Sequence, residues 1–293
     1  MKKQSLFYSP SFRPFLVGSP TFIWQILFFY LPLLFMIVSS FLHFSPTGEW
    51  EGFSLQSMQL FLSPIYLHVI LSSIFLALCT AIICLLIGYP LAYCLAFMKK
   101  KYRYVGLFLL FLPFWTNFLL HVYAWFYVLD TQGFLNQILL YLHIIDHPLE
   151  MLNTFPAIIL MMVYYYLPFM VLPIYSSLEK FNPYLLEASL DLGASWLQTL
   201  RRIIFPLTLK GVRAGFFLVY IPAFGEFAIP ELMGGDKWMF VGNVISQYIL
   251  AEGTQSLGSA FTLFSALCLV ISSGFIYYIM PWLVGGKIHE QKK

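Results

Sequence analysis

Charged residues are scarce in this sequence, and their scarcity decides its broad class. Asp, Glu, Lys and Arg make up 10% of the 293 residues, against 60% hydrophobic residues and a mean hydropathy of +0.80. So little polar surface cannot cover a water-soluble domain of this size, because soluble domains carry about 25% charged residues. The composition therefore predicts a polytopic membrane protein.

The sequence also lacks the motifs of several chemistries. It has no GxxxxGK[ST] run, so ATP hydrolysis would need another chain, and it has neither GxSxG nor HExxH. The cysteines lie in apolar runs without CxxC or Cys/His spacing, which predicts packing roles and neither disulfides nor a metal site. These cysteines are Cys79, Cys84, Cys94 and Cys268. Nothing indicates nucleic-acid binding, because membrane topology explains the basic clusters.

One pair of histidines leaves a metal site open. His143 and His147 are four residues apart and flank Asp146, which is a ligand-like set if the segment is helical. The segment reads as a loop of uncertain helicity, however, and no third ligand is evident. We therefore predict no metal in this chain.

Long apolar runs predict six membrane-spanning helices and an all-α fold. A run of about 20 residues crosses a hydrocarbon core of roughly 30 Å. The runs are 22–41, 64–98, 105–129, 154–176, 207–233 and one from about 258 to 284. The first is too long for a signal peptide and has no cleavage pattern after it, so we expect it to be retained. Residues 1–21 and 285–293 are then terminal segments of a transmembrane domain at 22–284, with a kink expected at Pro90 in the second run.

The basic residues give this topology an orientation. Three Lys or Arg lie in the N-terminal segment, four at 99–103, five at 180–213 and three in the C-terminal tail, so 15 of 16 fall on one side. Cytoplasmic loops carry such an excess, which places both termini in the cytoplasm of a bacterial inner membrane. The outer loops hold eight acidic residues against Lys237. They are Glu49, Glu51, Asp130, Asp146, Glu150, Glu231, Asp236 and Glu252. Such a face would concentrate cations, or would simply keep the loops solvated or contact a basic partner.

Residues 182–206, between the fourth and fifth runs, are predicted to form two short helices joined at a glycine, and we call this segment the elbow. Asn182 suits an N-cap, and Gly193 can adopt the left-handed conformation that ends a helix. Ser195 and the glutamine three residues later form a capping box for the second helix, which Pro206 is expected to close. The elbow could dock a cytoplasmic partner or lie on the membrane as an amphipathic helix.

The elbow resembles the EAA loop of ABC-importer permeases, whose pattern is EAA, three residues, G, nine residues and I-x-L-P. The matching positions are Glu187, Ala188, Ser189, Gly193, Ile203 and Pro206. Ser189 replaces the usual Ala and Phe205 the usual Leu, and both keep roughly the required size or apolarity. In that family the loop is the coupling helix that enters a groove of the ATPase. The resemblance implies a charged contact through Glu187, close backbone approach at Ala188 and Ser189, and a bend at Gly193.

Glu226 is interpreted as the one clear ionisable residue inside a span. A carboxylate there is costly and by default faces a cavity or a partner. If the span is helical throughout, Pro222 and Pro230 share its face, and each frees a backbone carbonyl four residues earlier. Such a stripe would attract cations. Pairing with a group of another subunit is the structural alternative.

Aromatic residues make up 19% of the chain, and most are expected to pack the membrane domain. Trp125, near Asp130 at the outer end of the third span, and Tyr220, near Glu226, could box an aliphatic ammonium by cation–π contact. Packing is the alternative for each ring.

The sequence is therefore identified as a six-span permease subunit of a type I ABC importer. The segments 88–93 and 225–232 are similar to the spermidine/putrescine permeases of that superfamily. The resemblance implies a second related permease, two cytoplasmic ATPase subunits that carry ATP and Mg²⁺, a periplasmic binding protein, and a polyamine moved by alternating access through the lipid bilayer. It implies no cofactor in this chain. An importer of another small solute, such as an aminophosphonate, and a membrane-embedded enzyme using Glu226 or the loop histidines are the alternatives.

Overall fold

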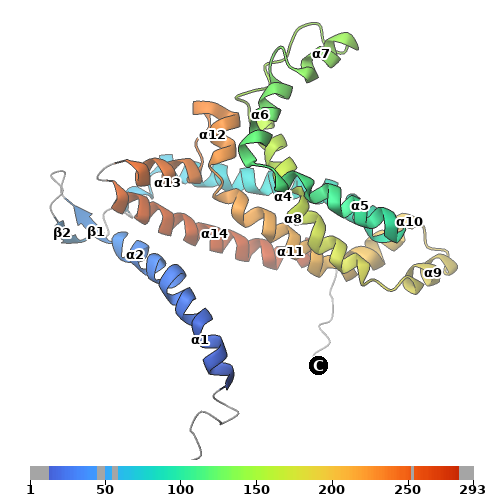
Figure 1. Cartoon of the computed structure of the whole chain (residues 1–293), viewed down its shortest axis with the longest axis horizontal. Helices are drawn as coiled ribbons and strands as arrows, with labels where there is room; N and C mark the ends of the chain where they lie inside the picture. Colours follow the sequence, from blue (N-terminus) through green and yellow to red (C-terminus); the bar gives the residue numbers. More distant parts are fainter. Residues whose placement is uncertain (1–12, 45–49, 55–58, 252–253, 284–293) are drawn as a thin grey trace, which may run out of the picture. The chain divides into compact units, whose positions relative to one another are not determined.

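The computed structural model describes residues 13–44, 50–54, 59–251 and 254–283, and they are mostly helical (Figure 1). The chain forms two compact units, one of 1–63 with 245–264 and one of 64–244 with 265–293. Helices α13 (Val241–Leu250) and α14 (Gln255–Leu283) contribute residues to both units. The predicted terminal segments lie largely outside the described residues, as do Glu49 and Glu252.

The first unit begins with a long apolar helix and a hairpin. Its elements are α1 (Arg13–Gln25), a π-helical turn (Ile26–Tyr30), α2 (Leu31–Ser39), β1 (Leu42–Phe44) and β2 (Trp50–Phe53). The strands pair antiparallel, with Leu42 opposite Phe53. The span candidate at Ser19–Ser39 is apolar and has none of its residues buried within the chain. Such a helix suits a lipid or protein surround.

The second unit is built around three helices. Its elements are α4 (Pro64–Phe97), α5 (Lys100–Phe111), α6 (Phe118–Leu129), α7 (Phe134–Tyr141), α8 (Phe155–Glu179), α9 (Tyr184–Asp191), α10 (Trp196–Thr199), α11 (Phe205–Phe224) and α12 (Ala228–Gly234). Helices α4, α8 and α11 pack on one another and supply most of the buried core. Helix α4 continues through Pro90 without a break.

Small residues let these three helices approach closely. A Cβ added at Gly211 would lie 2.4 Å from the carbonyl oxygen of Pro173, and one at Gly215 would lie 2.8 Å from that of Met170. Glycine is therefore required where α11 crosses α8, as is common in membrane bundles. The hydroxyls of Tyr89 and Thr208, 3.0 Å apart, add a buried hydrogen bond between α4 and α11.

Five helices of the described residues are long and apolar enough to cross a membrane, and a bent pair would make the sixth. The bent pair corrects the predicted third span, which is not one straight helix. The segments Lys100–Trp115 and Phe118–Tyr141 meet at 96°. Pro113 lies in a 3-10 turn there (Leu112–Trp115), and Asn117 is the N-cap of α6, where its Oδ1 accepts the N–H of Leu119 at 2.8 Å. The bend follows because proline cannot continue the helical hydrogen bonding and Asn117 starts a new helix.

The predicted fifth span is also interrupted. Helix α11 ends at Phe224, residues 225–227 are not helical, and α12 follows. At its other end α11 is continuous with the elbow, because α10 passes through a π-helical turn (Leu200–Ile204) into α11. Pro206 therefore lies inside a continuous helical run, directly after the π-helical turn, and does not close the elbow as predicted. Helices α7 and α13 lie in segments that were expected to be loops.

Candidate functional site

Local hydrogen bonds set the elbow's backbone. The N–H of Tyr184 donates to Oδ1 of Asn182 at 3.1 Å, and α9 begins one residue later than predicted. Gly193 has φ +76°, and a Cβ there would meet nothing within 4 Å, so the backbone and not crowding requires glycine. Ser195 Oγ accepts the N–H of Gln198 at 3.4 Å, while Gln198 Oε1 accepts the N–H of Ser195 at 2.9 Å. The left-handed glycine and the capping box are confirmed.

Within the predicted EAA run, the three residues point in different directions. Glu187 and Ala188 are exposed, whereas Ser189 is 3% exposed. The Ser189 hydroxyl donates to the carbonyl of Leu186 at 2.8 Å and lies 2.9 Å from the hydroxyl of Thr199. Ser189 therefore ties α9 to α10, and its small size serves the inside of the elbow rather than an outer contact.

The outer surface of the elbow is largely apolar. Its exposed side chains include Tyr184, Leu185, Leu190, Leu192, Trp196 and Leu197. Ile203 and Pro206 are half-buried where the elbow enters α11. The exposed carboxylates of Glu187 and Asp191, set among exposed apolar side chains, can dock against the groove of another protein.

Glu226 lies in the break between α11 and α12, where two donors hold its carboxylate. The Tyr166 hydroxyl donates to Oε2 at 2.7 Å, and the backbone N–H of Ala228 donates to Oε1 at 3.1 Å. The side chain remains half-buried. Glu226 therefore has polar partners within this chain, whereas the structural alternative placed its partner in another subunit. Each carboxylate oxygen can still accept a further hydrogen bond.

The break also corrects the expected stripe with the two prolines. Pro222 lies near the end of α11 and Pro230 near the start of α12, with three non-helical residues around Glu226 between these helices. Helical spacing therefore does not relate them.

Helix α13 packs closely against this break. A Cβ at Gly242 would lie 2.5 Å from the carbonyl oxygen of Gly225 and 2.8 Å from that of Glu226. Asn243 Nδ2 donates to the carbonyl of Phe227 at 3.4 Å. The N–H of Val241 donates to Ser73 Oγ of α4 at 2.8 Å, which fixes the start of α13. The shape of the break therefore depends on residues distant in sequence.

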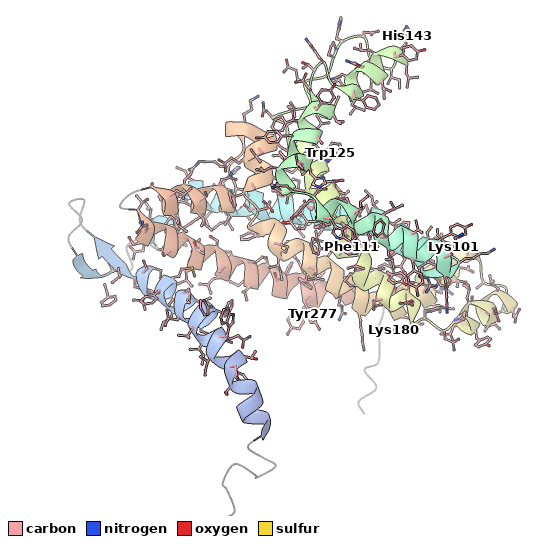
Figure 2. The ribbon with its side chains drawn as sticks, viewed as in Figure 1. Lys101, Phe111, Trp125, His143, Lys180 and Tyr277 are labelled. Atoms are coloured by element: carbon pink, nitrogen blue, oxygen red, sulfur yellow. The ribbon has the colours of Figure 1, made fainter. Side chains whose placement is uncertain are left out.

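The other three residues predicted to bind a cation, Tyr220, Trp125 and Asp130, differ in how exposed they are. Tyr220 is 0% exposed, and its hydroxyl donates to Ser272 Oγ at 2.9 Å, so it packs α11 against α14 and does not face an open surface. Trp125 lies on α6 (Figure 2) and is half-buried. Its ring centroid is 5.5 Å from that of Tyr164. Asp130 is exposed, and its Oδ1 accepts the N–H of Gln132 at 2.9 Å. Helix α6 contacts α12, which follows Glu226.

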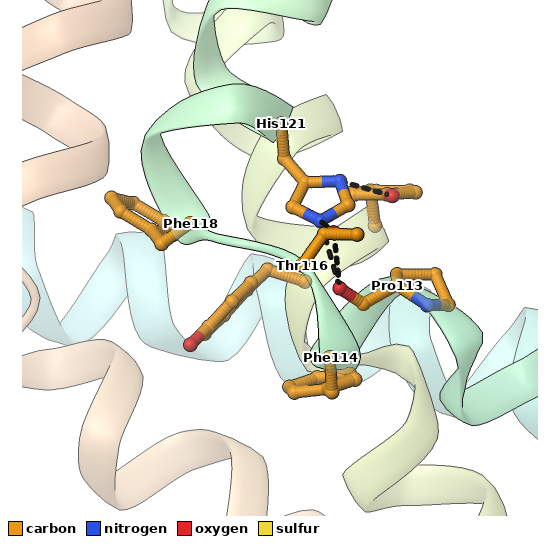
Figure 3. Close-up of a pocket in the computed structure, with 7 residues that line it drawn as sticks. Pro113, Phe114, Thr116, Phe118 and His121 are labelled. Atoms are coloured by element: carbon orange, nitrogen blue, oxygen red, sulfur yellow. Dashed lines mark hydrogen bonds between the residues drawn. The ribbon is translucent and has the colours of Figure 1, made fainter.

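His121 forms a half-buried polar cluster at the bend between α5 and α6 that the sequence analysis does not predict (Figure 3). Its Nε2–H donates to the carbonyl of Pro113 at 2.8 Å and also contacts Thr116, whose hydroxyl donates to the same carbonyl at 2.8 Å. The Tyr164 hydroxyl lies 2.8 Å from Nδ1. The adjoining cavity is only about 50 Å³. These groups satisfy one another, so the cluster fixes the bend; a histidine in an apolar run was the available signal.

The described residues contain no group of three or more His, Cys, Asp or Glu side chains arranged to hold a metal ion. His143 has φ +53° and lies beyond the end of α7, so the helical pairing with His147 is not formed.

Comparisons with known proteins give the family. The family described as "Binding-protein-dependent transport system inner membrane component" matches residues 85–285. The spermidine/putrescine transport system permease protein PotB of Salmonella typhimurium LT2 is 43% identical, over 91% of this chain and 93% of its own length. PotB of Escherichia coli K12 is 44% identical, over 87% and 92%.

A solved structure is similar in fold. A bacterial alginate ABC transporter, crystallised with a periplasmic protein bound to an alginate pentasaccharide, has a chain that superposes with a TM-score of 0.67 at 19% identity. The alignment covers 93% of this chain and 96% of that one.

Proposed function

The chain belongs to the family of binding-protein-dependent transport system inner membrane components, and we propose that, within this family, it imports polyamines. It is a multi-pass inner-membrane protein and a permease subunit of an ABC importer, with the type I fold, and not an enzyme. The observation that carries the polyamine proposal is the identity of 43% to a spermidine/putrescine permease over 91% of the chain.

The break at Glu226 is the site that we assign to the passing cation. A polyamine carries several ammonium groups, and a half-buried carboxylate in an unwound membrane segment can accept their N–H bonds. Tyr166 and the N–H of Ala228 hold the carboxylate in place without neutralising it. Trp125 and Asp130 on α6 would receive the substrate toward the outer end, where an indole face and a carboxylate suit an alkylammonium.

The elbow is the element that we assign to coupling. Glu187 and the exposed apolar side chains around it would enter a groove of a cytoplasmic ATPase, and Gly193 sets the angle between α9 and α10. Because α10 continues into α11, displacement of the elbow would be transmitted to the Glu226 break at the far end of α11. ATP and Mg²⁺ would bind to two ATPase subunits, and this chain would supply alternating access.

A second related permease and a periplasmic binding protein complete the proposed importer. This arrangement requires both termini and the elbow in the cytoplasm. Cysteine labelling in intact cells is expected to protect positions near Lys100, Ser195 and Lys292 and to label positions near Glu51, Asp146 and Asp236. Labelling of Ser195 from outside would overturn the orientation.

The polyamine proposal is tested by Glu226→Gln in the assembled importer. The amide keeps the shape and removes the charge, so uptake of labelled spermidine is expected to fall roughly five- to hundredfold, from a lost charge contact of about 1 to 3 kcal/mol. Glu226→Asp is expected to fall less. Tyr166→Phe is the matched variant, since it leaves the charge and removes its hydrogen-bond donor.

Complex abundance and ATPase activity in the same vesicles separate transport from folding. A purely structural role predicts scarce complex in Glu226→Gln, because the buried contacts of the break would be disturbed. Wild-type uptake by an abundant Glu226→Gln complex would remove the cation site. Competition by unlabelled diamines, aminophosphonates and neutral solutes tests the substrate class, and competition by a neutral or anionic solute alone would contradict a polyamine cargo.

A further inference from the structure

Two cations lie within the apolar helix that crosses the membrane after the elbow. Lys210 and Arg213 are three residues apart in α11, and we call them the basic pair. Arg213 lies eight residues after Phe205, or about 12 Å along the helix axis. A cation at this depth is costly and ordinarily has a partner.

The described part of the chain offers the basic pair little compensation. The Arg213 guanidinium lies 5.2 Å from the ring centroid of Tyr277 on α14, a cation–π contact. Its Nε is buried without an acceptor. Among the described residues, neither cation has a carboxylate in ion-pair contact, whereas Arg103 pairs with Glu179 at 2.9 Å. Arg213 therefore has unused donor capacity and an unbalanced charge.

The basic pair lies on the side of α11 that faces away from α8. Gly211 and Gly215, which pack on α8, lie on the opposite side of α11 from Arg213, and Lys210 lies within one turn of Arg213. Tyr277 forms the neighbouring surface on α14 (Figure 2). Leu207, three residues before Lys210 on α11, and Tyr278, next to Tyr277 on α14, are exposed apolar or aromatic side chains. This is an outward face of a membrane helix.

We propose that Lys210 and Arg213, with Tyr277, bind the phosphate of an anionic phospholipid. Both side chains are long enough to extend toward the headgroup layer while their stems stay among apolar groups. The guanidinium suits a phosphate because it donates two parallel hydrogen bonds, and the aromatic face holds it in place. Basic residues between helices are a known basis of headgroup recognition. The lipid chains would lie along the exposed apolar residues. This inference does not depend on the polyamine proposal.

The importer purified with its partners provides the test, in nanodiscs of phosphatidylcholine with a minor share of phosphatidylglycerol. Native mass spectrometry counts retained phosphatidylglycerol, and titration of that lipid gives its apparent affinity. Lys210→Gln with Arg213→Gln is expected to weaken the affinity roughly 25-fold, about fivefold for each cation. Arg213→Lys keeps the charge and is expected to retain the lipid. Lys180→Gln, at an exposed lysine outside the span, is the matched control.

Three outcomes would overturn the site. One is unchanged phosphatidylglycerol retention in the double variant, and another is an equal loss in Lys180→Gln. The third is loss of the second permease from the double variant with lipid retained, which would show that a protein carboxylate is the partner. If the double variant inserts poorly, the single variants Lys210→Gln and Arg213→Lys decide, because one removes a charge and the other keeps it. Spermidine uptake in the same preparations tests the polyamine proposal separately.

Discussion

The elbow and the Glu226 break are both interruptions beside membrane helices, but they are held in opposite ways. In the elbow, the capping box and the Ser189–Thr199 bond join residues at most ten positions apart. In the break, Tyr166 reaches Glu226 across 60 positions, and α13 closes over the carbonyl of Gly225. The elbow exposes the carboxylates of Glu187 and Asp191, whereas the carboxylate of Glu226 in the break is half-buried.

This difference separates two kinds of defect. A change in the elbow alters a surface whose backbone is maintained locally, so the chain should still insert. A change that crowds the packing of the break alters contacts among α8, α11 and α13, so folding and transport should fall together, whereas Glu226→Gln keeps the shape of the side chain and is expected to lower transport alone. The following variants test that separation, beginning with the largest expected effect.

Gly193→Val is expected to abolish uptake while leaving the chain in the membrane. The native φ of +76° is a conformation that a β-branched residue avoids, so the turn between α9 and α10 must change. Uptake of labelled spermidine and copurification of the ATPase measure the effect. Gly193→Asn is the matched control, because Asn tolerates left-handed backbone. Equal uptake in the Val and Asn variants would show that the elbow does not depend on this turn.

Gly242→Ala is expected to lower both the amount of complex and its uptake. The added Cβ would lie 2.5 Å from the carbonyl oxygen of Gly225, so α13 or the break must move, at about 1 to 3 kcal/mol. Gly225→Ala is the control within the same contact, since a Cβ there meets nothing within 4 Å. Thermal unfolding of the purified complex and uptake are measured together. Normal thermal stability with lost uptake in Gly242→Ala would contradict this, because it would show that a packing change in the break affects transport without affecting folding.

The same contrast explains what the sequence could predict. The turn at Gly193 and the capping box at Ser195 are local signals, and both are confirmed. Pro113 and Asn117 at the bend are residues of the same kind, but the continuous apolar run around them favours one straight span. The burial of Tyr220 against Ser272 depends on α14, 52 positions away, and no local pattern contains it.

The partners of charged residues inside the spans also cannot be predicted from local sequence patterns. Glu226 was singled out, but the pattern around it assumed a continuous helix, and the true partner is the hydroxyl of Tyr166 on α8. The positive-inside rule assigns Arg213 to the cytoplasmic side of the membrane and does not say whether it lies in a loop or within a span. Arg213 lies within α11 beside Tyr277 because α10 continues into α11, so that the helix begins before this residue.

The ion pair between Arg103 and Glu179 lies at the end of α8, just before the elbow in the chain. Its loss is expected to have the smallest effect on uptake of the changes considered. Arg103 of α5 donates to Glu179 Oε1 at 2.9 Å and to the carbonyl of Ala96 at 2.7 Å. Tyr175 donates to the same carboxylate oxygen at 2.9 Å. The pair therefore joins the ends of α4, α5 and α8 three residues before the elbow begins at 182.

Glu179→Gln is expected to lower spermidine uptake per ATP hydrolysed by less than about fivefold, with normal membrane abundance. The carboxylate is 48% exposed, so solvent screening limits the pair to about 1 kcal/mol, although Arg103 is 18% exposed and loses its counterion. A double-mutant cycle with Arg103→Gln isolates the pair from the separate bond to Ala96, because that bond is lost only with Arg103. Lys180→Gln is the adjacent exposed control. Additive effects in the cycle, or an equal change in Lys180→Gln, would mean that α5 and α8 approach the elbow independently. If the two variants are non-additive in uptake per ATP but not in membrane abundance, the ion pair at the end of α8 takes part in coupling together with the elbow.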